Sequence, residues 1–248
     1  MTISIITVCY NSAATIRDTL ESVRAQTGQP VQHIVIDGAS TDGTPDIVRE
    51  YQHVDRLVCE PDRGLYDAMN KGIRLATGDV IGILNSDDYY PHHGVLAAVG
   101  KTLDIHQTPA LYGDLKYVHP LRPHRVLRYW RSGYYTSNRF RYGWMPPHPA
   151  FFVRRECYER LGNYDISFRS AADYELMLRF LYKHRLPACY LPEVLVHMRS
   201  GGRSGASLRH RIHANREDRK AWLKNGLRPA FFTLWIKPIR KIPQYFWH

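Results

Sequence analysis

The stretch Ile81-Gly82-Ile83-Leu84-Asn85-Ser86-Asp87-Asp88 decides how this chain is organised. Its apolar residues predict a buried strand, and the strand ends abruptly in two adjacent carboxylates. Two carboxylates this close repel each other unless a positive charge lies between them. Carboxylate oxygens are the ligands that Mg²⁺ and Mn²⁺ prefer, so one interpretation is a metal site at the edge of a sheet. The alternative is an ordinary turn, because Asn, Ser and Asp also favour turns.

The first half of the sequence alternates predicted strands and helices. Strands are expected at residues 3–9, 33–36, 56–59 and 80–84, and helices between them at 16–24, 44–51 and 65–76. Short connections in this order predict an α/β fold with a parallel, doubly wound sheet. Ligands of such sheets bind beyond the carboxyl ends of the strands. Polar side chains follow each predicted strand: Tyr10 and Asn11, Asp37, Glu60 with Asp62 and Arg63, and Asp87 with Asp88.

Two common phosphate-binding loops are missing from the sequence. The turn Cys9-Tyr10-Asn11-Ser12 lacks the Gly-x-Gly-x-x-Gly pattern, and no Gly-x-x-x-x-Gly-Lys-Ser/Thr pattern occurs. A bound phosphate would therefore need another partner, and a cation held by Asp87 and Asp88 would neutralise it. This consideration favours the metal site over the plain turn.

The composition is that of a globular protein whose charge is unevenly distributed. Of the 248 residues, 44% are hydrophobic and 23% are charged, and the formal net charge is +11. Residues 1–118 hold 9 Lys and Arg against 15 Asp and Glu, whereas residues 119–248 hold 25 against 8. A basic second half suits nucleic acid, an anionic membrane or a phosphorylated substrate. The four cysteines form no Cys-x-x-Cys pair and indicate neither a zinc site nor a disulfide framework.

Five motifs in the first half resemble the family 2 glycosyltransferases of the GT-A fold. They are SIITVCYN at 4–11, IDGASTDGT at 36–44, DRGLYDAMNKG at 62–72, ATGD at 76–79 and LNSDD at 84–88. The similarity extends over about residues 1–200 and looks closest to the bacterial branch that assembles exopolysaccharide or O-antigen units, of the colanic-acid type. It implies a GT-A fold with a mainly parallel sheet, a nucleotide-diphospho-sugar donor (a UDP-sugar before a GDP-sugar), and Mn²⁺ or Mg²⁺ as cofactor.

The resemblance also implies donor-binding residues. Asp37 would accept an N–H group of the base, the segment from Thr7 to Tyr10 would line the base pocket, and Arg63 would approach the base or the phosphates. The implied donor set is Thr7, Tyr10, Asp37, Arg63, Asn70, Lys71 and Asp87. Each position also has a simpler interpretation, such as a turn for Asp37 or a solvated polar helix face for Asn70 and Lys71.

The same resemblance implies a metal site at the opening stretch. Asp88 would be the direct ligand, and Asp87 would contact the ribose, a metal-bound water or the metal itself. His197 is a further candidate ligand. The motif of the family usually begins with an acid where this chain has Asn85-Ser86, so the choice between the two carboxylates stays open.

Residues 170–179, SAADYELMLR, predict the start of an amphipathic helix. Relatives usually carry Glu-Asp here, and the Asp acts as the catalytic base; in this chain Asp173 takes that position after Ala172. A positioned carboxylate can take the proton of an acceptor hydroxyl as it attacks the anomeric carbon. One base without a second carboxylate nucleophile implies a single displacement with inversion. The alternative is that Asp173 only stabilises the first helical turn.

The second half carries the acceptor-side candidates. His148, between two prolines, would face the active site, and Asp114 would line the sugar pocket. The basic stretch 197–204 resembles a loop that folds over the diphosphate, with Arg199 and Arg203 as phosphate contacts. Plain loop positions are the alternative for all of these residues.

The predicted domain organisation is a catalytic unit at 1–205 followed by a tail at 206–248. Within the catalytic unit, 1–118 would bind the nucleotide-sugar and 119–205 the acceptor. The aromatic and basic tail suits the interface of an anionic membrane, and packing on its own domain or in a homodimer is the alternative. The sequence has neither signal-peptide features nor a run of roughly 20 apolar residues. We therefore expect a cytoplasmic enzyme, peripherally bound to the inner face of the cytoplasmic membrane, that acts on a polyprenyl-diphosphate-linked saccharide.

Two other functions compete with this hypothesis. A nucleic-acid-binding protein would use the aromatic and arginine residues that interleave at 131–142, although the fold context favours an acceptor loop there and no nucleic-acid partner. A sugar nucleotidyltransferase on a similar fold would need a loop rich in glycine and arginine after the first strand. The turn Tyr10-Asn11-Ser12 is not such a loop.

Overall fold

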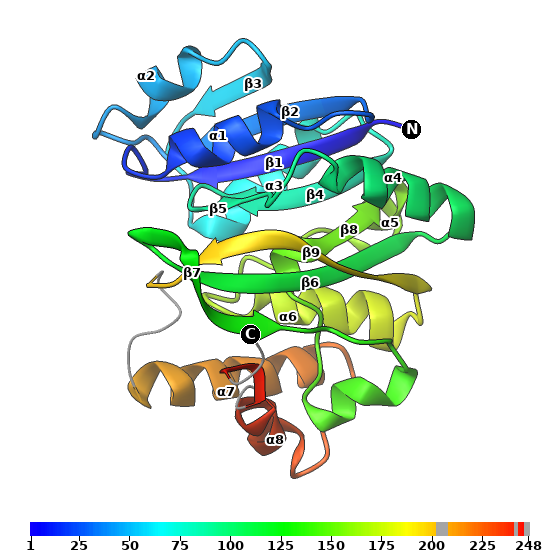
Figure 1. Cartoon of the computed structure of the whole chain (residues 1–248). Helices are drawn as coiled ribbons and strands as arrows, with labels where there is room; N and C mark the ends of the chain where they lie inside the picture. Colours follow the sequence, from blue (N-terminus) through cyan, green and yellow to red (C-terminus); the bar gives the residue numbers. More distant parts are fainter. Residues whose placement is uncertain (202–207, 241–242, 246–248) are drawn as a thin grey trace.

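The structure is a computed structural model that describes residues 1–201, 208–240 and 243–245 (Figure 1). Its strands are β1 (Ile3–Cys9), β2 (Val31–Asp37), β3 (Val54–Cys59), β4 (Val80–Asn85), β5 (Asp88–Tyr89), β6 (Ala110–His119), β7 (Arg122–Trp130), β8 (Phe151–Arg154) and β9 (Ala188–Arg199). Its α-helices are α1 (Ile16–Arg24), α2 (Thr44–Arg49), α3 (Leu65–Leu75), α4 (Val95–His106), α5 (Arg155–Leu161), α6 (Ala172–Met177), α7 (Leu208–Lys224) and α8 (Thr233–Ile239). Shorter helical segments are η1 (Ser137–Tyr142), η2 (His148–Ala150), η3 (Leu178–Lys183) and η4 (Pro243–Tyr245).

The strands form one mixed sheet in the order β3-β2-β1-β4-β8-β6-β9-β5, with β7 added to β6. β1 runs parallel to both β2 and β4, and β2 runs parallel to β3, as the sequence predicts. β8 is antiparallel to β4 and β6, and it joins this half to the parallel pair β6 and β9. The α/β fold is therefore confirmed, with a second half of mixed strand direction.

Helices cover both faces of the parallel half (Figure 1). α1 and α2 pack on one face through Ile16, Leu20 and Val48, and α4 covers its continuation. The other face packs against α3, α5 and α6, and it receives Ile6 and Val8 of β1. Because successive side chains of a strand point to opposite faces, a strand between two helical layers is buried on both faces and is mostly apolar. All seven residues of β1 are buried, and five of them are apolar.

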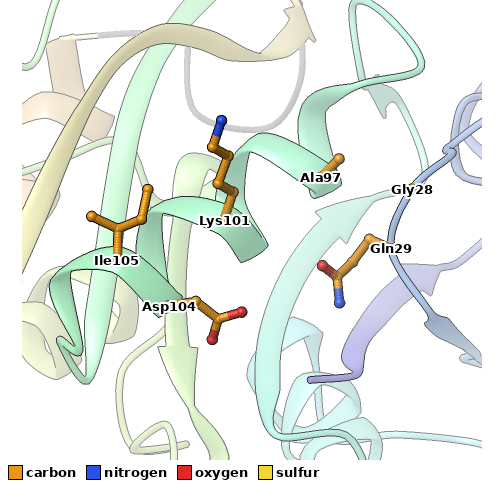
Figure 2. Close-up of a pocket in the computed structure, with 6 residues that line it drawn as sticks. All are labelled: Gly28, Gln29, Ala97, Lys101, Asp104 and Ile105. Carbon is orange, nitrogen blue, oxygen red and sulfur yellow. The ribbon is translucent and has the colours of Figure 1, made fainter.

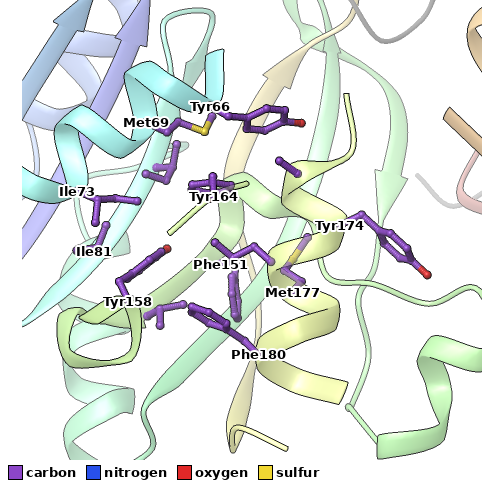
Figure 3. Close-up of a cluster of buried hydrophobic side chains, with 14 of the residues drawn as sticks. Tyr66, Met69, Ile73, Ile81, Phe151, Tyr158, Tyr164, Tyr174, Met177 and Phe180 are labelled. Atoms are coloured by element: carbon purple, nitrogen blue, oxygen red, sulfur yellow. The ribbon is translucent and has the colours of Figure 1, made fainter. Parts of the chain in front are cut away.

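The larger apolar cluster lies between α3 and α6 (Figure 3). Figure 3 shows Tyr66 and Met69 of α3 above Tyr164, with Phe151 of β8 and Met177 of α6 on the opposite side. The rings of Tyr66 and Tyr164 stack with their centroids 5.7 Å apart. This packing fixes α3 against the start of α6, and both elements carry side chains of the candidate site.

The helix α7 belongs to the same core. Trp222 is fully buried and donates a hydrogen bond from Nε1 to the Tyr174 hydroxyl of α6 at 2.8 Å. Asn225 donates from Nδ2 to Glu175 at 3.0 Å. The predicted boundary at residue 205 falls in the segment 202–207, outside the described residues. Among the helices that the structure describes, none has the length and apolar character needed to cross a membrane.

Several element ends differ from the predicted ones. The strand expected at 56–59 begins earlier, at Val54, and the helix expected at 44–51 ends at Arg49. The last strand, β9, begins at Ala188, and its first residues, Ala188 to Tyr190, pair with β6. The helix expected at 170–179 is α for six residues and then continues as the wider turn η3.

Candidate active site

Asp87 and Asp88 follow β4 at the carboxyl edge of the parallel strands, where the sequence predicts a ligand site. The Asp88 carboxylate is fully buried; its Oδ2 accepts a hydrogen bond from Asn85 Nδ2 at 3.1 Å, and no described residue donates to its Oδ1. Burial and then the charge of Asp87 raise the pKa of Asp88 well above its usual range. Asp87 is partly exposed, and its pKa is also raised by burial. Of the two carboxylates, Asp87 is the one that a ligand can reach from outside.

Arg199 lies directly beside this pair. Its Nη1 donates to the Asp87 carbonyl oxygen at 3.1 Å, and its Nη2 forms an ion pair with Asp18 of α1. Its charge lowers the pKa of both Asp87 and Asp88, against the larger effect of burial. Arg199 is therefore a buried cation next to the predicted phosphate site, whereas Arg203 lies outside the described residues.

Asp173 lies in the first turn of α6 and is held from two sides. Its Oδ1 accepts a hydrogen bond from the Tyr66 hydroxyl of α3 at 3.3 Å, and its Oδ2 lies 3.4 Å from His148 Nδ1 in η2. Burial lowers the pKa of His148, while the charges of Asp173 and Asp87 act to raise it. His148 is thus within electrostatic reach of both carboxylates. The predicted base, the predicted acceptor-side histidine and the acid that follows β4 share one site.

The surroundings of Asp173 are those that a proton-accepting carboxylate requires. The Asp173 side chain keeps 19% of its surface exposed, so a substrate hydroxyl can reach it. Tyr66 and His148 each contact a different oxygen of Asp173 and so fix the plane of the carboxylate. A carboxylate held in this way can act as a general base.

The oxygen atoms after β4 also fit a hard divalent cation. Oδ1 of Asn85 and Oδ1 of Asp88 are buried acceptors without a donor among the described residues, and Asp87 adds a partly exposed carboxylate. Within the described ranges, no three His, Cys, Asp or Glu residues are grouped to hold a metal. Mg²⁺ is commonly bound by one or two carboxylates together with substrate phosphates and waters. The residues therefore fit a cation that is completed by a phosphorylated substrate.

Asp37 differs from its predicted role. It is fully buried, its Oδ2 accepts from the Ser40 backbone N–H at 2.8 Å, and its Oδ1 accepts from the Ser40 hydroxyl at 2.5 Å. The carboxylate thus holds the turn after β2, and a base cannot reach it in this arrangement. Tyr10 is 60% exposed at the end of β1, and the Arg63 side chain is 75% exposed, so these two predicted residues remain accessible at the same edge.

Three other predicted donor-binding residues make internal contacts instead. Thr7 is fully buried in the centre of β1. Asn70 donates to the Tyr164 carbonyl oxygen at 2.8 Å and accepts from the Tyr164 N–H at 2.9 Å, so both ends of its amide are used. Lys71 forms an ion pair with Glu60 at 2.9 Å. Because these side chains hold the scaffold together, we leave them out of the donor site.

Asp114 joins three segments instead of lining a sugar pocket. Its carboxylate is buried and accepts hydrogen bonds, each 2.8 Å long, from the hydroxyls of Tyr129 and Tyr190 and from the Ser132 N–H. Tyr129 and Ser132 lie at the end of β7 and just beyond it, whereas Tyr190 lies in β9. The predicted role in acceptor binding is not supported by this set of contacts.

His197 does not join the carboxylates after β4. It pairs with Tyr89 across β5 and β9, and the two rings pack edge to face. Burial and then the positive charges of Lys116 and His92 lower its pKa to about 4. A metal ion would be repelled by the same charges, so His197 is not retained as a candidate ligand.

Tyr66 is a residue of the site that the sequence analysis missed. It lies inside the DRGLYDAMNKG motif, but no spacing rule connects it to Asp173 about a hundred residues later. The pair formed by Asp18 and Arg199 was missed for the same reason.

A separate depression of about 470 Å³ lies between α4 and the turn before β2, and it contains none of these residues. Figure 2 shows Gln29 and Asp104 at its sides, with Lys101 pointing away from Asp104. Its lining lacks a group of polar side chains that converge on one point, so the candidate site remains the edge beyond β4.

Comparisons with known proteins identify the family of the chain. The model of glycosyl transferase family 2 matches residues 4–162. The chain belongs to glycosyl transferase family 2. It is 30% identical over 197 residues to the PGL/p-HBAD biosynthesis glycosyltransferase of Mycobacterium bovis (strain BCG). The aligned region covers 77% of this chain and 74% of that relative. As a member of this family, it is a glycosyltransferase that uses a nucleotide-sugar.

Solved structures support the fold of the family. Residues 1–349 of Staphylococcus aureus TarS in complex with UDP-GlcNAc superpose with a TM-score of 0.68 at 19% identity, covering 99% of this chain and 73% of that one. The chain spans 41% of the longer TarS structure. The mannosyltransferase PcManGT from Pyrobaculum calidifontis, in complex with GDP-Man and Mn²⁺, superposes with a TM-score of 0.66 at 23% identity. The match covers 95% of this chain and 72% of that one. The GT-A fold expected from the sequence is confirmed.

Proposed function

We propose that this glycosyltransferase inverts the anomeric centre and depends on a divalent metal. It would move a sugar from a UDP-sugar, or alternatively a GDP-sugar, to a hydroxyl group of a polyprenyl-diphosphate-linked saccharide. Such a step belongs to the assembly of bacterial exopolysaccharide or O-antigen units, of the colanic-acid type. The observation that carries the proposal is the position of His148. Its Nδ1 lies 3.4 Å from Oδ2 of Asp173, and the negative charge of Asp87 also acts to raise its pKa. It brings a general base next to the edge that would receive the donor diphosphate.

The reaction follows from the roles of these side chains. The acceptor hydroxyl attacks the anomeric carbon, its proton passes to a carboxylate oxygen of Asp173, and the bond to the diphosphate oxygen breaks. Tyr66 and His148 hold Asp173 in the orientation that accepts this proton. The contacts of Asp173 come from a tyrosine and a histidine, and neither can act as a second carboxylate nucleophile. This supports one displacement, with inversion.

Asp87 would be the main carboxylate ligand of Mn²⁺ or Mg²⁺, and Asp88 would support it from the protein interior. The sequence favoured Asp88 as the direct ligand, but Asp88 is fully buried and Asp87 is partly exposed. When bound, the cation would stabilise the charge that develops on the leaving diphosphate. The complexes of TarS with UDP-GlcNAc and of PcManGT with GDP-Man and Mn²⁺ support a nucleotide-sugar and a metal of this kind for the present chain.

A thermal-shift panel tests the donor. Full-length protein is heated with UDP-sugars and GDP-sugars, each with Mn²⁺ and with EDTA. A ligand at 100 times its Kd stabilises a protein by about 2.7 kcal/mol, which corresponds to a rise of several degrees in Tm. We expect this rise for UDP-sugars with Mn²⁺ and its loss with EDTA. The absence of any metal-dependent shift across the panel would contradict the proposal.

The acceptor class is supported by an exposed apolar surface at the C-terminal end. Phe231, Trp235 and Ile239, which we call the aromatic stripe, follow one another at intervals of four residues and are 90%, 72% and 61% exposed. Arg228 and Arg240 beside them are also exposed. Phe231 lies in the turn before α8, and Trp235 and Ile239 lie on α8. Exposed aromatic and basic side chains close together in the chain suit the interface of an anionic membrane. A peripheral enzyme on the inner face of the cytoplasmic membrane would meet a lipid-linked saccharide there.

Vesicle flotation tests this surface. Wild-type protein should float with vesicles rich in phosphatidylglycerol and not with pure phosphatidylcholine. A variant with Phe231→Ser, Trp235→Ser and Ile239→Ser should bind at least about 10-fold more weakly, because three apolar side chains no longer enter the lipid. Leu121→Ser, at a turn residue that is 87% exposed, is the matched control and should bind normally. A stripe variant that floats normally but changes from dimer to monomer would instead identify the stripe as a subunit interface.

A further inference from the structure

The buried face of α7 carries two acidic side chains. Glu217 and Asp218 are only 7% and 6% exposed, and they share this face with Ala221 and Trp222, which follow four residues later and are fully buried. A carboxylate is buried in a protein only where hydrogen-bonded or charged partners replace the water that it loses. The partners of these two acids therefore show which segments α7 holds.

Glu217 holds the segment that leads into α6. Its Oε1 accepts a hydrogen bond from the Arg169 N–H at 2.9 Å, and its Oε2 accepts from the Ser170 N–H at 2.8 Å and from the Ser170 hydroxyl at 2.7 Å. The N-cap residue of α6 is Ala171, whose side chain has no hydrogen-bond acceptor. Two consecutive backbone amides before α6 are thus held by an acid from a different helix.

Other side chains of α7 hold the chain on both sides of this segment. Lys220 donates from Nζ to the Ser167 carbonyl oxygen at 2.9 Å, ahead of the segment. Trp222 donates to the Tyr174 hydroxyl at 2.8 Å, beyond it. The candidate base Asp173 therefore lies in a stretch of chain that α7 anchors at several points.

We propose that Glu217 is a positioning residue, which fixes the backbone before α6 so that Asp173 meets the acceptor hydroxyl. Only two residues separate Ser170 from Asp173, so a shift of Ser170 would displace the carboxylate. Tyr66 and His148 orient the carboxylate itself, whereas Glu217 determines where α6 begins. This inference rests on the proposed function, because it concerns the general base of that reaction. It also gives α7, which the sequence placed in a tail, a part in the catalytic unit.

Glu217→Gln tests the inference in the full-length enzyme. One carboxylate oxygen becomes an NH₂ group, which would meet the N–H of Arg169 or of Ser170 donor to donor, so at least one anchor is lost. A misplacement of about 1 Å can cost about 100-fold in rate, and we expect kcat to fall by about 10- to 100-fold. The KM for the donor and the affinity for UDP with Mn²⁺ should not change, because the residues beyond β4 are untouched.

Turnover is measured as the release of UDP from the UDP-sugar that stabilises the protein most, with a polyprenyl-diphosphate-linked monosaccharide as acceptor. Asp218→Asn is the matched control, because it removes an equal charge from the next position of the same buried face. Asp218 accepts a hydrogen bond from Lys237 of α8 at 2.7 Å, so its loss should leave kcat close to that of wild-type protein. Equal losses of kcat in the two variants would indicate a general loosening of α7 and would overturn the inference.

A double variant separates positioning from folding. If Glu217 acts only through Asp173, Glu217→Gln should lower kcat no further in the Asp173→Asn background, because residues that act as a unit are not additive. Losses that multiply would contradict this role. Ser170→Ala removes one of the three hydrogen bonds and leaves Glu217 intact, so it serves where Glu217→Gln does not fold. It should give a smaller loss of kcat that also disappears in the Asp173→Asn background.

The outcomes separate this inference from the function on which it rests. Strongly reduced transfer by Asp173→Asn, together with wild-type kcat in Glu217→Gln, would overturn the inference alone. Normal turnover in Asp173→Asn, or no sugar transfer by wild-type protein, would overturn the proposed function, and this inference with it.

Discussion

The carboxylates of two regions contrast sharply in their surroundings. Asp37, at the end of β2, and Asp114, in β6, are buried and accept two or three short hydrogen bonds each. Asp87 and Asp173, at the edge beyond β4, are partly exposed and have fewer donors. The first pair holds turns and strands in place, and the second pair is free to meet a substrate. What distinguishes a structural acid from a reactive one in this fold is the number of donors already committed to it.

The largest expected effect is on the reaction itself. Asp173→Asn keeps the shape of the side chain but removes the general base, so transfer should fall by about 10²- to 10⁴-fold. Release of nucleoside diphosphate from the donor measures it. The Tm should stay close to that of wild-type protein, because Asp173 is not buried among several donors. Turnover close to that of wild-type protein would remove Asp173 from the mechanism.

Asp114→Ala should instead lower the stability of the protein. Three donors would lose their acceptor in the protein interior, and each unpaired donor costs about 1–3 kcal/mol. We expect the free energy of unfolding to fall by at least about 3 kcal/mol, measured by urea denaturation. Asp46→Ala, at an exposed position on α2, is the control and should change it little. If Asp114→Ala were as stable as this control, the contrast between the two regions would lose its basis.

Acid should destabilise the scaffold through His33. This residue is fully buried in β2, and burial, followed by the charge of His53, lowers its pKa to about 3. Because the unfolded chain has a pKa near 6.5, it binds the proton more tightly, and the contribution of neutral His33 to stability is complete above pH 6.5. It should decline as the pH falls from 6.5 toward 3, by about 2 kcal/mol at pH 5. His33→Gln should show a shallower decline in urea titrations between pH 7 and 5; an unchanged slope would assign the sensitivity to other groups.

The smallest expected effect concerns Tyr66, which would orient Asp173 without taking the proton itself. Tyr66→Phe removes one hydrogen bond at 3.3 Å from Asp173 but leaves the stacked ring in place. We expect kcat to fall by up to about 10-fold, the value of one hydrogen bond, with little change in KM for the donor. Tyr164→Phe, in the other ring of the same stack, is the matched control. A change in KM without a change in kcat would mean that Tyr66 contacts the donor instead.

Local signals in the sequence predicted the parallel half of the fold well. The apolar runs that become β1 and β4 and the periodic residues of α1 are sufficient by themselves, because two helical layers bury both faces of these strands. The order of motifs also brought Asp87, Asp173 and His148 into one prediction. The sequence could not show which of the acidic side chains keep a carboxylate oxygen available for a ligand. Whether Ser40 caps Asp37, or Tyr129 and Tyr190 reach Asp114, depends on contacts between distant segments and not on spacing.

The most direct test of the account is the binding of UDP with Mn²⁺ by Asp87→Asn and Asp173→Asn, measured by isothermal titration. The account places donor and metal binding on Asp87 and proton removal on Asp173. It predicts that Asp173→Asn binds UDP with the affinity of wild-type protein, whereas Asp87→Asn loses most of the affinity that Mn²⁺ adds. Equal losses in both variants, or a normal response to Mn²⁺ in Asp87→Asn, would contradict it.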